Sequence, residues 1–429
     1  MVGTITLLAV FFITLLLGMP IAFSVGLATM ITMIIQGVHL TEIPHNMFVS
    51  LNSFPLLAMP LFILAGDIML KGRITKMLIA MADVFVGRLR GGLGHVNIMT
   101  SMLFGGITGM ATADTTAIGS MLIPAMVEKG YDRDYSTAIT IASSVIGPII
   151  PPSLTFVVYS LAAGRVSIGG LFLAGALPGA LVGVSLMVVN HFFSKKRNYE
   201  RRAYKMPFSE SLRIFRNGFL ALLMPIIVIG GIIGGVFTAT EAAGVASLYA
   251  LVICLFVFKS LKLRELPGIF FTSLKTSAII GLILGTSKAF SWVLTTLNVP
   301  QLIGQGLTAI STSPIFFLLV VNIVLLIIGT VIDTFPAILI FAPIFHPIAL
   351  SYGIEPLHFG VVLCANLLIG LNTPPVGTGL FLGCAIGKVS IEKLVRASLP
   401  FTLVELVVLL LITYIPFFTL FIPRITNFL

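Results

Sequence analysis

Long apolar runs separated by short polar connections dominate the amino-acid sequence. Apolar residues fill 2–17, 19–36 and 42–70, and Pro55 and Pro60 interrupt the third run. A helix needs roughly 20 mostly apolar residues to cross a bilayer. The pattern therefore predicts three membrane spans at the start of the chain.

Residues 71–91 follow a different pattern, in which charged and apolar positions are interleaved at helical spacing. Lys71 and Lys76 are interleaved with Ile74 and Leu78, so that the apolar side chains share one face of a helix. Such a segment is typical of an amphipathic helix that lies at the membrane surface.

The next two apolar regions have polar or glycine-rich centres. Residues 93–127 contain the stretch Gly105 to Ala117, and we expect two half-helices that form a re-entrant hairpin with this stretch at its tip. Residues 133–162 contain Gly147 to Pro152, and prolines break a helix because they lack an N–H donor. This region is predicted to be a broken membrane helix, and a full span follows at about 169–193.

The second half of the chain repeats this order. A second hairpin is predicted at 314–345, with its tip at Gly329 to Pro336. A second broken helix is predicted at 357–386, with its break at Gly370 to Pro375. Full spans are predicted at about 217–236, 240–258, 266–297 and 394–421.

Matching residues indicate an internal duplication. Gly370 and the Pro374-Pro375 pair lie 223 positions after Gly147 and the Pro151-Pro152 pair. Further matches pair Arg165 with Lys388 at the same offset, and Asp114 and Pro124 with Asp333 and Pro343 at an offset of 219. A single proline pair is also typical of a simple kink. Helices interrupted twice at matching places indicate instead a transporter with a binding site near the membrane midplane.

These elements divide the chain into two repeats. Residues 1–193 form the first repeat and 217–429 the second, while 194–216 form a basic cytoplasmic hinge with eight Lys or Arg residues. Each repeat has five crossings and one hairpin that returns to its own side, and an odd number of crossings inverts the second repeat relative to the first. The predicted fold is therefore an all-α polytopic membrane protein with two inverted repeats.

The composition and the charge distribution agree with a membrane protein. The chain is 58% hydrophobic and 9% charged, whereas soluble domains carry about 25% charged residues. With the hinge in the cytoplasm, 21 of the 25 Lys and Arg residues are cytoplasmic, as the positive-inside rule requires. Both termini are then periplasmic, the first hairpin enters from the cytoplasm and the second from outside. The net charge of +10 is scattered, so no nucleic-acid partner is expected.

The interrupted elements predict an ion and substrate site. Backbone carbonyls exposed inside a bilayer persist only where they line a cavity or bind a ligand. Unwound carbonyls suit sodium, and half-helix N-termini suit anionic groups. The predicted sodium-binding residues are Thr112, Ala113, Asp114, Gly147 and Pro148 in the first half, and Val331, Asp333, Thr334, Gly370 and Thr373 in the second. The predicted substrate-binding residues are Thr115, Ser153, Asn372 and Thr378.

Four side chains, two of them among the predicted sodium ligands, have more than one interpretation. Asp114 and Asp333 are also suited to cap half-helices. Lys288, one helical turn before Trp292, is either a substrate or partner contact or a residue that extends to the membrane interface. Glu405 in the last span is a candidate proton relay or ion-pair partner. No catalytic motif and no metal-ligand spacing is present in the sequence, so sodium is the only metal expected and no cofactor is predicted.

With these motifs the chain resembles the large membrane subunit of the tripartite ATP-independent periplasmic (TRAP) transporters. The resemblance covers the whole chain. It is carried by Gly18-Met-Pro20, Phe54-Pro-Leu56, Leu64-Ala-Gly66, Ala111-Thr-Ala-Asp-Thr115, Thr240-Glu-Ala-Ala243 and Asn372-Thr-Pro-Pro-Val-Gly377. The paired hairpins and broken helices are also similar to those of the divalent-anion sodium symporters in the same ion-transporter superfamily.

The resemblance implies a function as well as a fold. It implies a multi-pass subunit in the bacterial inner membrane that imports a carboxylate substrate with sodium as the coupling ion, by an elevator mechanism. Sialic acid is the first expected substrate and a C4-dicarboxylate the next. The implied partners are a small four-helix membrane subunit, a periplasmic substrate-binding protein and membrane lipid. The alternative is a self-sufficient sodium- or proton-coupled anion transporter; an enzyme is not expected.

Overall fold

The computed structural model describes residues 2–164, 166–199 and 207–429, and within them the chain is helical without strands. The α-helices are α1 (Val2–Leu16), α2 (Ile21–Ile35), α3 (Glu42–Leu51), α4 (Ala58–Lys71), α5 (Ile74–Val86), α6 (Gly92–Thr108), α7 (Ala111–Glu128), α8 (Arg133–Ser144), α9 (Leu154–Ala163), α10 (Ile168–Lys196), α11 (Phe208–Ile233), α12 (Ala239–Val252), α13 (Leu266–Thr296), α14 (Val299–Ile310), α15 (Pro314–Val331), α16 (Thr334–Ser351), α17 (Pro356–Gly370), α18 (Thr378–Gly387), α19 (Ile391–Tyr414) and α20 (Phe417–Ile425).

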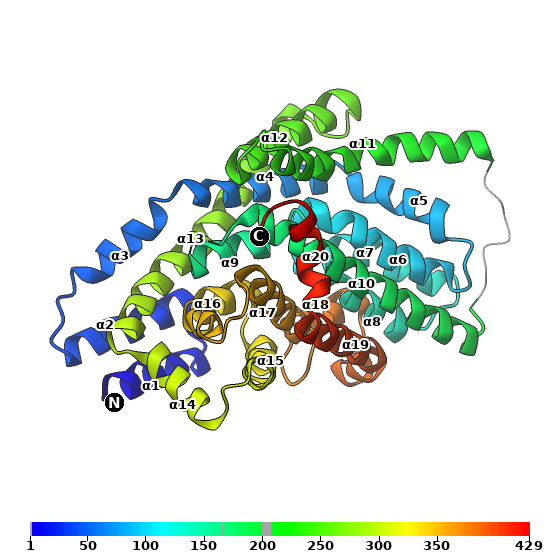
Figure 1. Cartoon of the computed structure of the whole chain (residues 1–429). Helices are drawn as coiled ribbons and strands as arrows, with labels where there is room; N and C mark the ends of the chain where they lie inside the picture. Colours follow the sequence, from blue (N-terminus) through cyan, green and yellow to red (C-terminus); the bar gives the residue numbers. More distant parts are fainter. Residues whose placement is uncertain (1, 165, 200–206) are drawn as a thin grey trace.

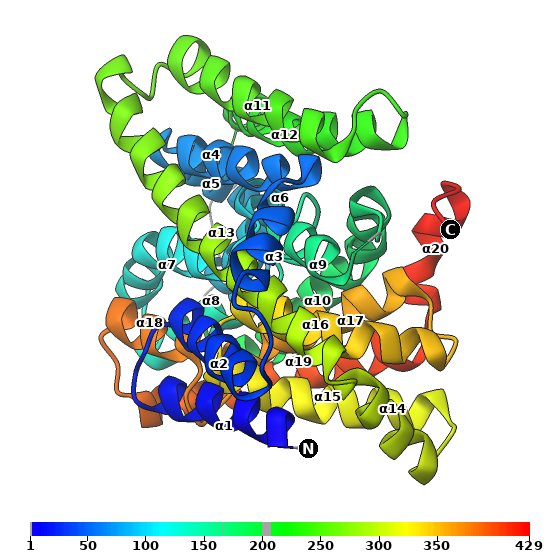
Figure 2. The same ribbon diagram turned by 90° about the vertical axis from the view of Figure 1, so that its left-hand side faces the viewer.

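The packing divides these helices into two sets. The frame helices are α1–α5 and α11–α14, in which α12 packs on α4, and α13 packs on α2, α3 and α4. The core helices are α6–α10 and α15–α20, in which α6, α7, α18 and α19 all pack on α8. The frame helices border the core along the top and left of Figure 1, and Figure 2 shows α13 running diagonally past α3. Contacts such as α13 with α16, and α4 with α9, join the two sets.

The core helices contain the four interrupted elements. α6 and α7 occupy the range of the first predicted hairpin and meet at Gly109, which has a φ of +60°. α15 and α16 occupy the range of the second, and α16 continues to Ser351, beyond the predicted end at 345. α8 and α9 are separated by the non-helical segment 145–153, and α17 and α18 by 371–377. Each proline pair therefore lies between two half-helices.

The helix bounds also fix which residues correspond between the halves. α7 begins at Ala111 and α16 at Thr334, and this offset of 223 is also found between the starts of α8 and α17. The predicted match of Asp114 with Asp333 at an offset of 219 is wrong, because Asp114 lies inside the first turn of α7 and Asp333 immediately precedes α16. The two hairpins thus place their acidic residues differently. Arg165, paired with Lys388 in the sequence comparison, lies outside the described residues.

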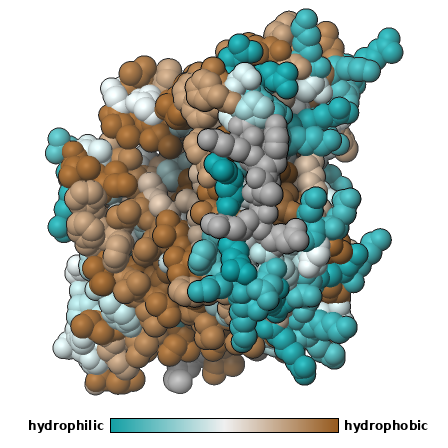
Figure 3. Space-filling model, turned by 90° about the vertical axis from the view of Figure 1, so that its right-hand side faces the viewer, coloured by the Kyte–Doolittle hydropathy of each residue, from teal (hydrophilic) through white to brown (hydrophobic). Residues whose placement is uncertain are grey.

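Two other regions differ from the predicted segments. α10 runs to Lys196 and α11 begins at Phe208, so helix extends into both ends of the predicted hinge 194–216, whose residues 200–206 lie outside the described part. The last predicted span is two helices, α19 and α20, because Pro416 follows the end of α19. Figure 3 shows hydrophilic residues gathered along one side of a largely hydrophobic face.

The helices are suited to a membrane by length and composition. Within the described residues, eight are long and apolar enough to cross a bilayer, and five shorter apolar helices include α9, α17 and α18, three of the four halves of the broken helices. Many large apolar side chains lie on the outside of the molecule, among them Leu17, Phe271 and Phe192. A bilayer stabilises such a surface, whereas water does not.

Candidate functional site

Glycine contacts bring each hairpin against the break in the same half of the chain. A Cβ on Gly105 in α6 would collide with the Cα of Gly147 in the first break. A Cβ on Gly370 would lie 2.7 Å from the Cα of Gly329 in α15. Since real Cβ atoms do not approach so closely, both positions require glycine. The backbones of hairpin and break are therefore in direct contact in both halves.

Asp114 lies beneath the first hairpin tip. Its side chain is fully buried, and Oδ1 accepts a hydrogen bond of 2.6 Å from the Thr108 hydroxyl. Oδ2 has no hydrogen-bond partner among the described residues, and it occupies the space that a Cβ on Gly147 would need. The structure thus brings Asp114 and Gly147, both predicted sodium-binding residues, into contact. A buried carboxylate oxygen without a partner is costly, and a bound cation would offset this cost.

The first break is held by its own serine. Ser153 precedes α9, and its Oγ accepts a hydrogen bond of 3.2 Å from the Phe156 N–H. The same hydroxyl donates to the carbonyl of Pro148. Ser153 and the Pro148 carbonyl, predicted as substrate and sodium contacts, are therefore bonded to each other. Thr115 is bonded within its own helix, since its hydroxyl donates to the Ala111 carbonyl at 3.0 Å.

The second break is tied both to its hairpin and to the first half of the chain. The Gly377 N–H donates to the Thr330 carbonyl at 2.7 Å. Asn372 is buried, and its Nδ2 donates to the Ile141 carbonyl near the end of α8 at 2.6 Å, while its Oδ1 has no partner within the described chain. The Thr373 hydroxyl donates to the Ile369 carbonyl at 2.8 Å. Asn372 therefore joins the two halves.

A helix N-cap lies at the tip of the second hairpin. Asp333 is the N-cap residue of α16, and its Oδ1 accepts a 2.7 Å hydrogen bond from the Thr334 N–H. The Thr334 hydroxyl is buried without a partner in the described part of the chain, as is the Thr378 hydroxyl at the start of α18. Val331, which ends α15, is 46% exposed, so its side chain points away from the interior.

One small cavity joins the tips and the breaks. It measures about 30 Å³. Its lining comes from the start of α7, the first break, α9, the start of α16 and the end of α17, through Met110, Ala111, Thr112, Pro148, Thr155, Asp333, Thr334, Phe335, Leu368 and Leu371. A single water needs roughly 10–15 Å³ of such space, so the cavity has room for an ion or a few waters and is too small for a sugar acid.

Three helix N-termini meet at this cavity. α7, α9 and α16 all begin in its lining, and each helix start carries a partial positive charge. Unpaired N–H groups at such ends are suited to anions. Thr155, which the sequence analysis missed, lines the cavity with a buried hydroxyl that has no partner among the described residues. Its position two residues after Ser153, at the start of the half-helix, is the signal that could have indicated it.

The chemistry available here is that of oxygen ligands and helix dipoles. The described residues contain no group of three or more His, Cys, Asp or Glu side chains that could hold a transition metal. The two predicted clusters are also not equally placed, since Thr112 and Pro148 share the cavity with Asp333 and Thr334, whereas Asp114 and Gly370 do not line it. The site therefore combines both hairpin tips with residues of both breaks.

Comparisons with known proteins decide the family. The family described as "Tripartite ATP-independent periplasmic transporter, DctM component" matches residues 8–418. The chain belongs to this family. It is therefore a large subunit of a TRAP transporter and not an enzyme, and it is a multi-pass protein of the inner membrane, as predicted.

Individual relatives match this TRAP subunit over most of its length. It is 43% identical to "Uncharacterized protein YgiK" of Salmonella typhimurium, over 98% of this chain and 97% of that protein. It is 38% identical to "Sialic acid TRAP transporter large permease protein SiaM" of Vibrio cholerae, over 95% of both chains. It is 39% identical to "C4-dicarboxylate TRAP transporter large permease protein DctM" of Pseudomonas aeruginosa, over 88% of both.

A solved structure shares the fold of the TRAP subunit. The structure titled "Crystal structure of the Alcanivorax borkumensis YdaH transporter reveals an unusual topology" aligns with a TM-score of 0.65 over 88% of both chains. The sequences are only 14% identical, so the likeness concerns the arrangement of helices. The predicted fold class, an all-α polytopic membrane protein of transporter type, is confirmed.

Proposed function

We propose that this TRAP subunit imports a carboxylate-bearing solute by sodium-coupled transport. The observation that carries the proposal is the convergence of the N-termini of α7, α9 and α16 on one cavity beside two helix breaks. Such ends stabilise a carboxylate without a buried lysine or arginine. Anionic substrates are named for the sialic acid and C4-dicarboxylate relatives.

We propose a sodium site next to Asp114. The free Oδ2 of this carboxylate lies over Gly147, where the first break exposes main-chain groups. The second ion site is proposed at the second break, with Asp333, Thr334, Gly370 and Thr373 as the groups to test. Thr112, Ala113, Pro148 and Val331 remain proposed ligands through their main-chain oxygens. Unwound backbone beside half-helices is a recurrent setting for sodium in transporters.

The size of the cavity supports a moving site. At about 30 Å³ it cannot hold the substrate in the conformation described. We propose that each of two inverted repeats contributes helices to both the frame and the core, and that the core helices move as a unit against the frame helices in an elevator mechanism. Residues 1–193 and 217–429 would be these repeats and 194–216 the cytoplasmic hinge between them.

Membership of the family supports a proposal for the substrate class and for the partners. A TRAP large subunit implies a small four-helix membrane subunit and a periplasmic substrate-binding protein, which would deliver the solute. Sialic acid is proposed first and a C4-dicarboxylate next, although identities of 38% and 39% to relatives of each kind do not rank them. Thr115, Ser153, Asn372 and Thr378 are the proposed substrate contacts, and of these Thr378 has its hydroxyl free among the described residues.

The test is uptake by the complete transporter in liposomes. The chain is reconstituted with its membrane partner and the binding protein, and uptake of sialic acid and of succinate is measured with an inward sodium gradient, and again with choline in place of sodium. We expect uptake of one of the two to require sodium. Equal uptake in both conditions would refute the sodium coupling.

One observation favours a second candidate, a self-sufficient proton-coupled anion transporter. Glu405 in α19 is 1% exposed, and both of its carboxylate oxygens lack a hydrogen-bond partner within the described chain. Ionisable groups inside a membrane protein often mark proton pathways. Uptake by this chain without partners, driven by a pH gradient and abolished by Glu405→Gln, would support this candidate over the tripartite one.

A further inference from the structure

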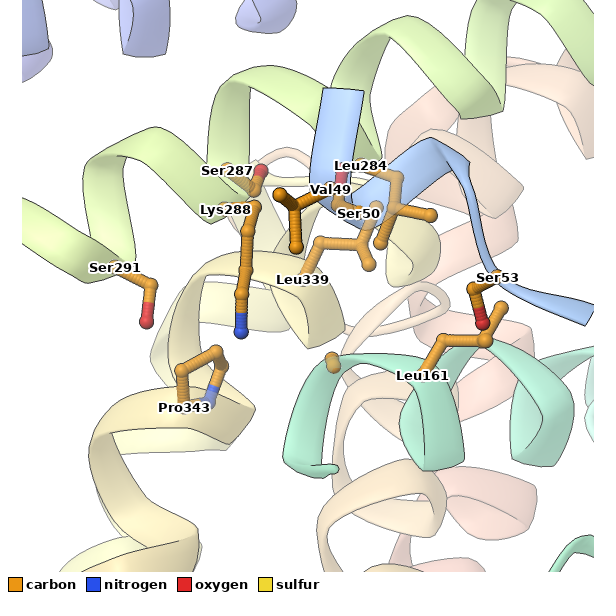
Figure 4. A pocket seen from close by; sticks show the side chains of 11 residues that line it. Val49, Ser50, Ser53, Leu161, Leu284, Ser287, Lys288, Ser291, Leu339 and Pro343 are labelled. Atoms are coloured by element: carbon orange, nitrogen blue, oxygen red, sulfur yellow. The ribbon is translucent and has the colours of Figure 1, made fainter. Parts of the chain in front are cut away.

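A second, larger cavity lies between the frame and the core. It measures about 190 Å³ and is lined by α3 and α13 of the frame and by α9 and α16 of the core. Figure 4 shows Lys288 of α13 extending toward Pro343 of α16, with its ammonium nitrogen directed into the space between the helices. We propose that this cavity binds the carboxylate of the solute through Lys288, as an access site that precedes the hairpin cavity. The proposal rests on the proposed transport function.

The ammonium group is free to bind an anion. Across the described ranges the single ion pair joins Arg197 to Asp132, and no hydrogen bond involves the Lys288 amine. Its side chain is exposed, so the charge is reachable from outside the protein. A lysine at membrane depth is energetically costly and is usually retained for function. A lysine that only reached the interface would point away from the protein instead of toward α16.

Hydroxyl groups surround this charge. Ser287 is 1% exposed, and its Oγ has no hydrogen-bond partner among the residues that the structure describes. Ser291 lies one turn further along the same helix, and Ser53 lines the opposite side of the cavity beside Leu161 (Figure 4). One cation with several hydroxyl donors is the polar set that a small hydroxylated or dicarboxylic anion requires. Ser50 also lines the cavity, with its hydroxyl bonded to the Met47 carbonyl, and the other lining residues, such as Leu161 and Leu339, are apolar.

The cavity is connected to the hairpin cavity by the same two helices. α9 and α16 pack together, and both begin at the hairpin cavity; α9 ends at this cavity, whereas α16 lines it with Leu339 and Pro343 and continues to Ser351. Thr155 and Leu161 lie six residues apart in α9, which corresponds to about 9 Å along a helix. With the predicted topology, this cavity is on the periplasmic side. The two cavities are therefore about 9 Å apart along α9, and we propose that an anion held by Lys288 passes from this cavity to the hairpin cavity.

The intrinsic fluorescence of Trp292 provides a binding assay for this site. Trp292 is the single tryptophan of the protein and lies one helical turn from Lys288. The purified full chain in sodium-free choline buffer is titrated with N-acetylneuraminate, succinate or chloride, and the tryptophan fluorescence is recorded. We expect a saturable change with at least one carboxylate and none with chloride at equal ionic strength.

Variants decide whether Lys288 is responsible. Lys288→Gln should weaken carboxylate binding about tenfold or more, the loss expected for a hydrogen bond to a charged group, while Lys288→Arg should retain it. Lys275→Gln is the matched control, because Lys275 is an exposed lysine of the same helix that does not line the cavity. Equal binding by the Lys288→Gln and Lys275→Gln variants would overturn the proposal. So would a response to phosphatidylglycerol vesicles with none to either carboxylate.

The fluorescence result is independent of sodium coupling. If the wild-type complex shows no sodium-dependent uptake but the fluorescence change requires Lys288, the proposed function fails and the binding site stands. If uptake is sodium-dependent and the Lys288→Gln variant has the same half-saturating substrate concentration as wild type, the access site fails alone.

Discussion

The side-chain amide of Asn372 donates a 2.6 Å hydrogen bond to the main-chain carbonyl of Ile141. Asn372 lies in the second break, and Ile141 lies in the last turn of α8 just before the first break. Helix ends leave carbonyls without a main-chain partner in the helix, and here the Ile141 carbonyl accepts from the Ser144 hydroxyl at 2.7 Å and from Asn372, 231 positions away. Removing this donor affects both breaks together.

Replacing Asn372 should therefore destabilise the fold before it affects substrate contact. Asn372→Ala and Asn372→Asp both remove the Asn372 donor, while the Ser144 hydroxyl still donates to the Ile141 carbonyl. Each substitution should therefore cost about 0.5–1.5 kcal/mol, the usual net contribution of one hydrogen bond. Chemical denaturation of the purified chain in detergent measures the loss. Thr373→Val is the control, since that hydroxyl bonds only within its own helix region. If Asn372→Asp were as stable as wild type, the donated hydrogen bond would not matter.

The glycine contacts predict strong positional effects. Gly105→Ala and Gly329→Ala place a methyl group against the opposing backbone, and overpacking of this kind costs about 1–3 kcal/mol. We expect lower thermal stability and loss of uptake in both variants. Gly230→Ala in α11 is the control, because no atom lies within 4 Å of the new Cβ; this variant should be stabilised by about 0.5–1 kcal/mol. A wild-type melting temperature for Gly105→Ala would contradict the contact.

Asp114 and Asp333 should differ in their effect on sodium dependence. Asp114→Asn retains the side-chain size but removes the charge whose Oδ2 lies free over Gly147. We expect the sodium concentration for half-maximal uptake to rise about tenfold, the effect of roughly 1.4 kcal/mol of lost ion binding. Asp333→Asn should change it less, because asparagine is an equally good N-cap. Unchanged sodium activation in the Asp114→Asn variant would exclude this carboxylate as an ion ligand.

The raised pKa of Tyr131, a residue outside the membrane-spanning helices, predicts that the stability of the fold depends on pH. It stacks on Tyr199 with ring centroids 4.1 Å apart, and burial raises the pKa of Tyr131 from 10.0 to about 12. Because the folded-state pKa is the higher one, the stability due to the neutral phenol is complete below pH 10 and decreases toward pH 12. Tyrosinate absorbance and denaturation across this range measure it. Tyr131→Phe should lose less stability than wild type over the same interval; an equal loss would refute the assignment.

The sequence by itself determined the class of the protein and the position of its interrupted elements. Apolar runs long enough for a bilayer admit little besides membrane helices, and proline pairs cannot remain inside a helix. Both proline pairs do lie between half-helices, at 145–153 and 371–377. The family followed from local motifs in the same way.

Only the tertiary structure decided which polar groups are free to act. Ser153 and Asn372 looked available in the sequence, but their hydrogen bonds are made to Pro148 and to Ile141. Thr155 was not predicted as a site residue, yet it lines the hairpin cavity with a buried hydroxyl that has no partner among the described residues. Hydrogen bonding depends on which segments meet in space, and a periodic pattern records only which face of a helix is apolar. The pairing of hairpin tip, break and distant carbonyl therefore required the folded chain.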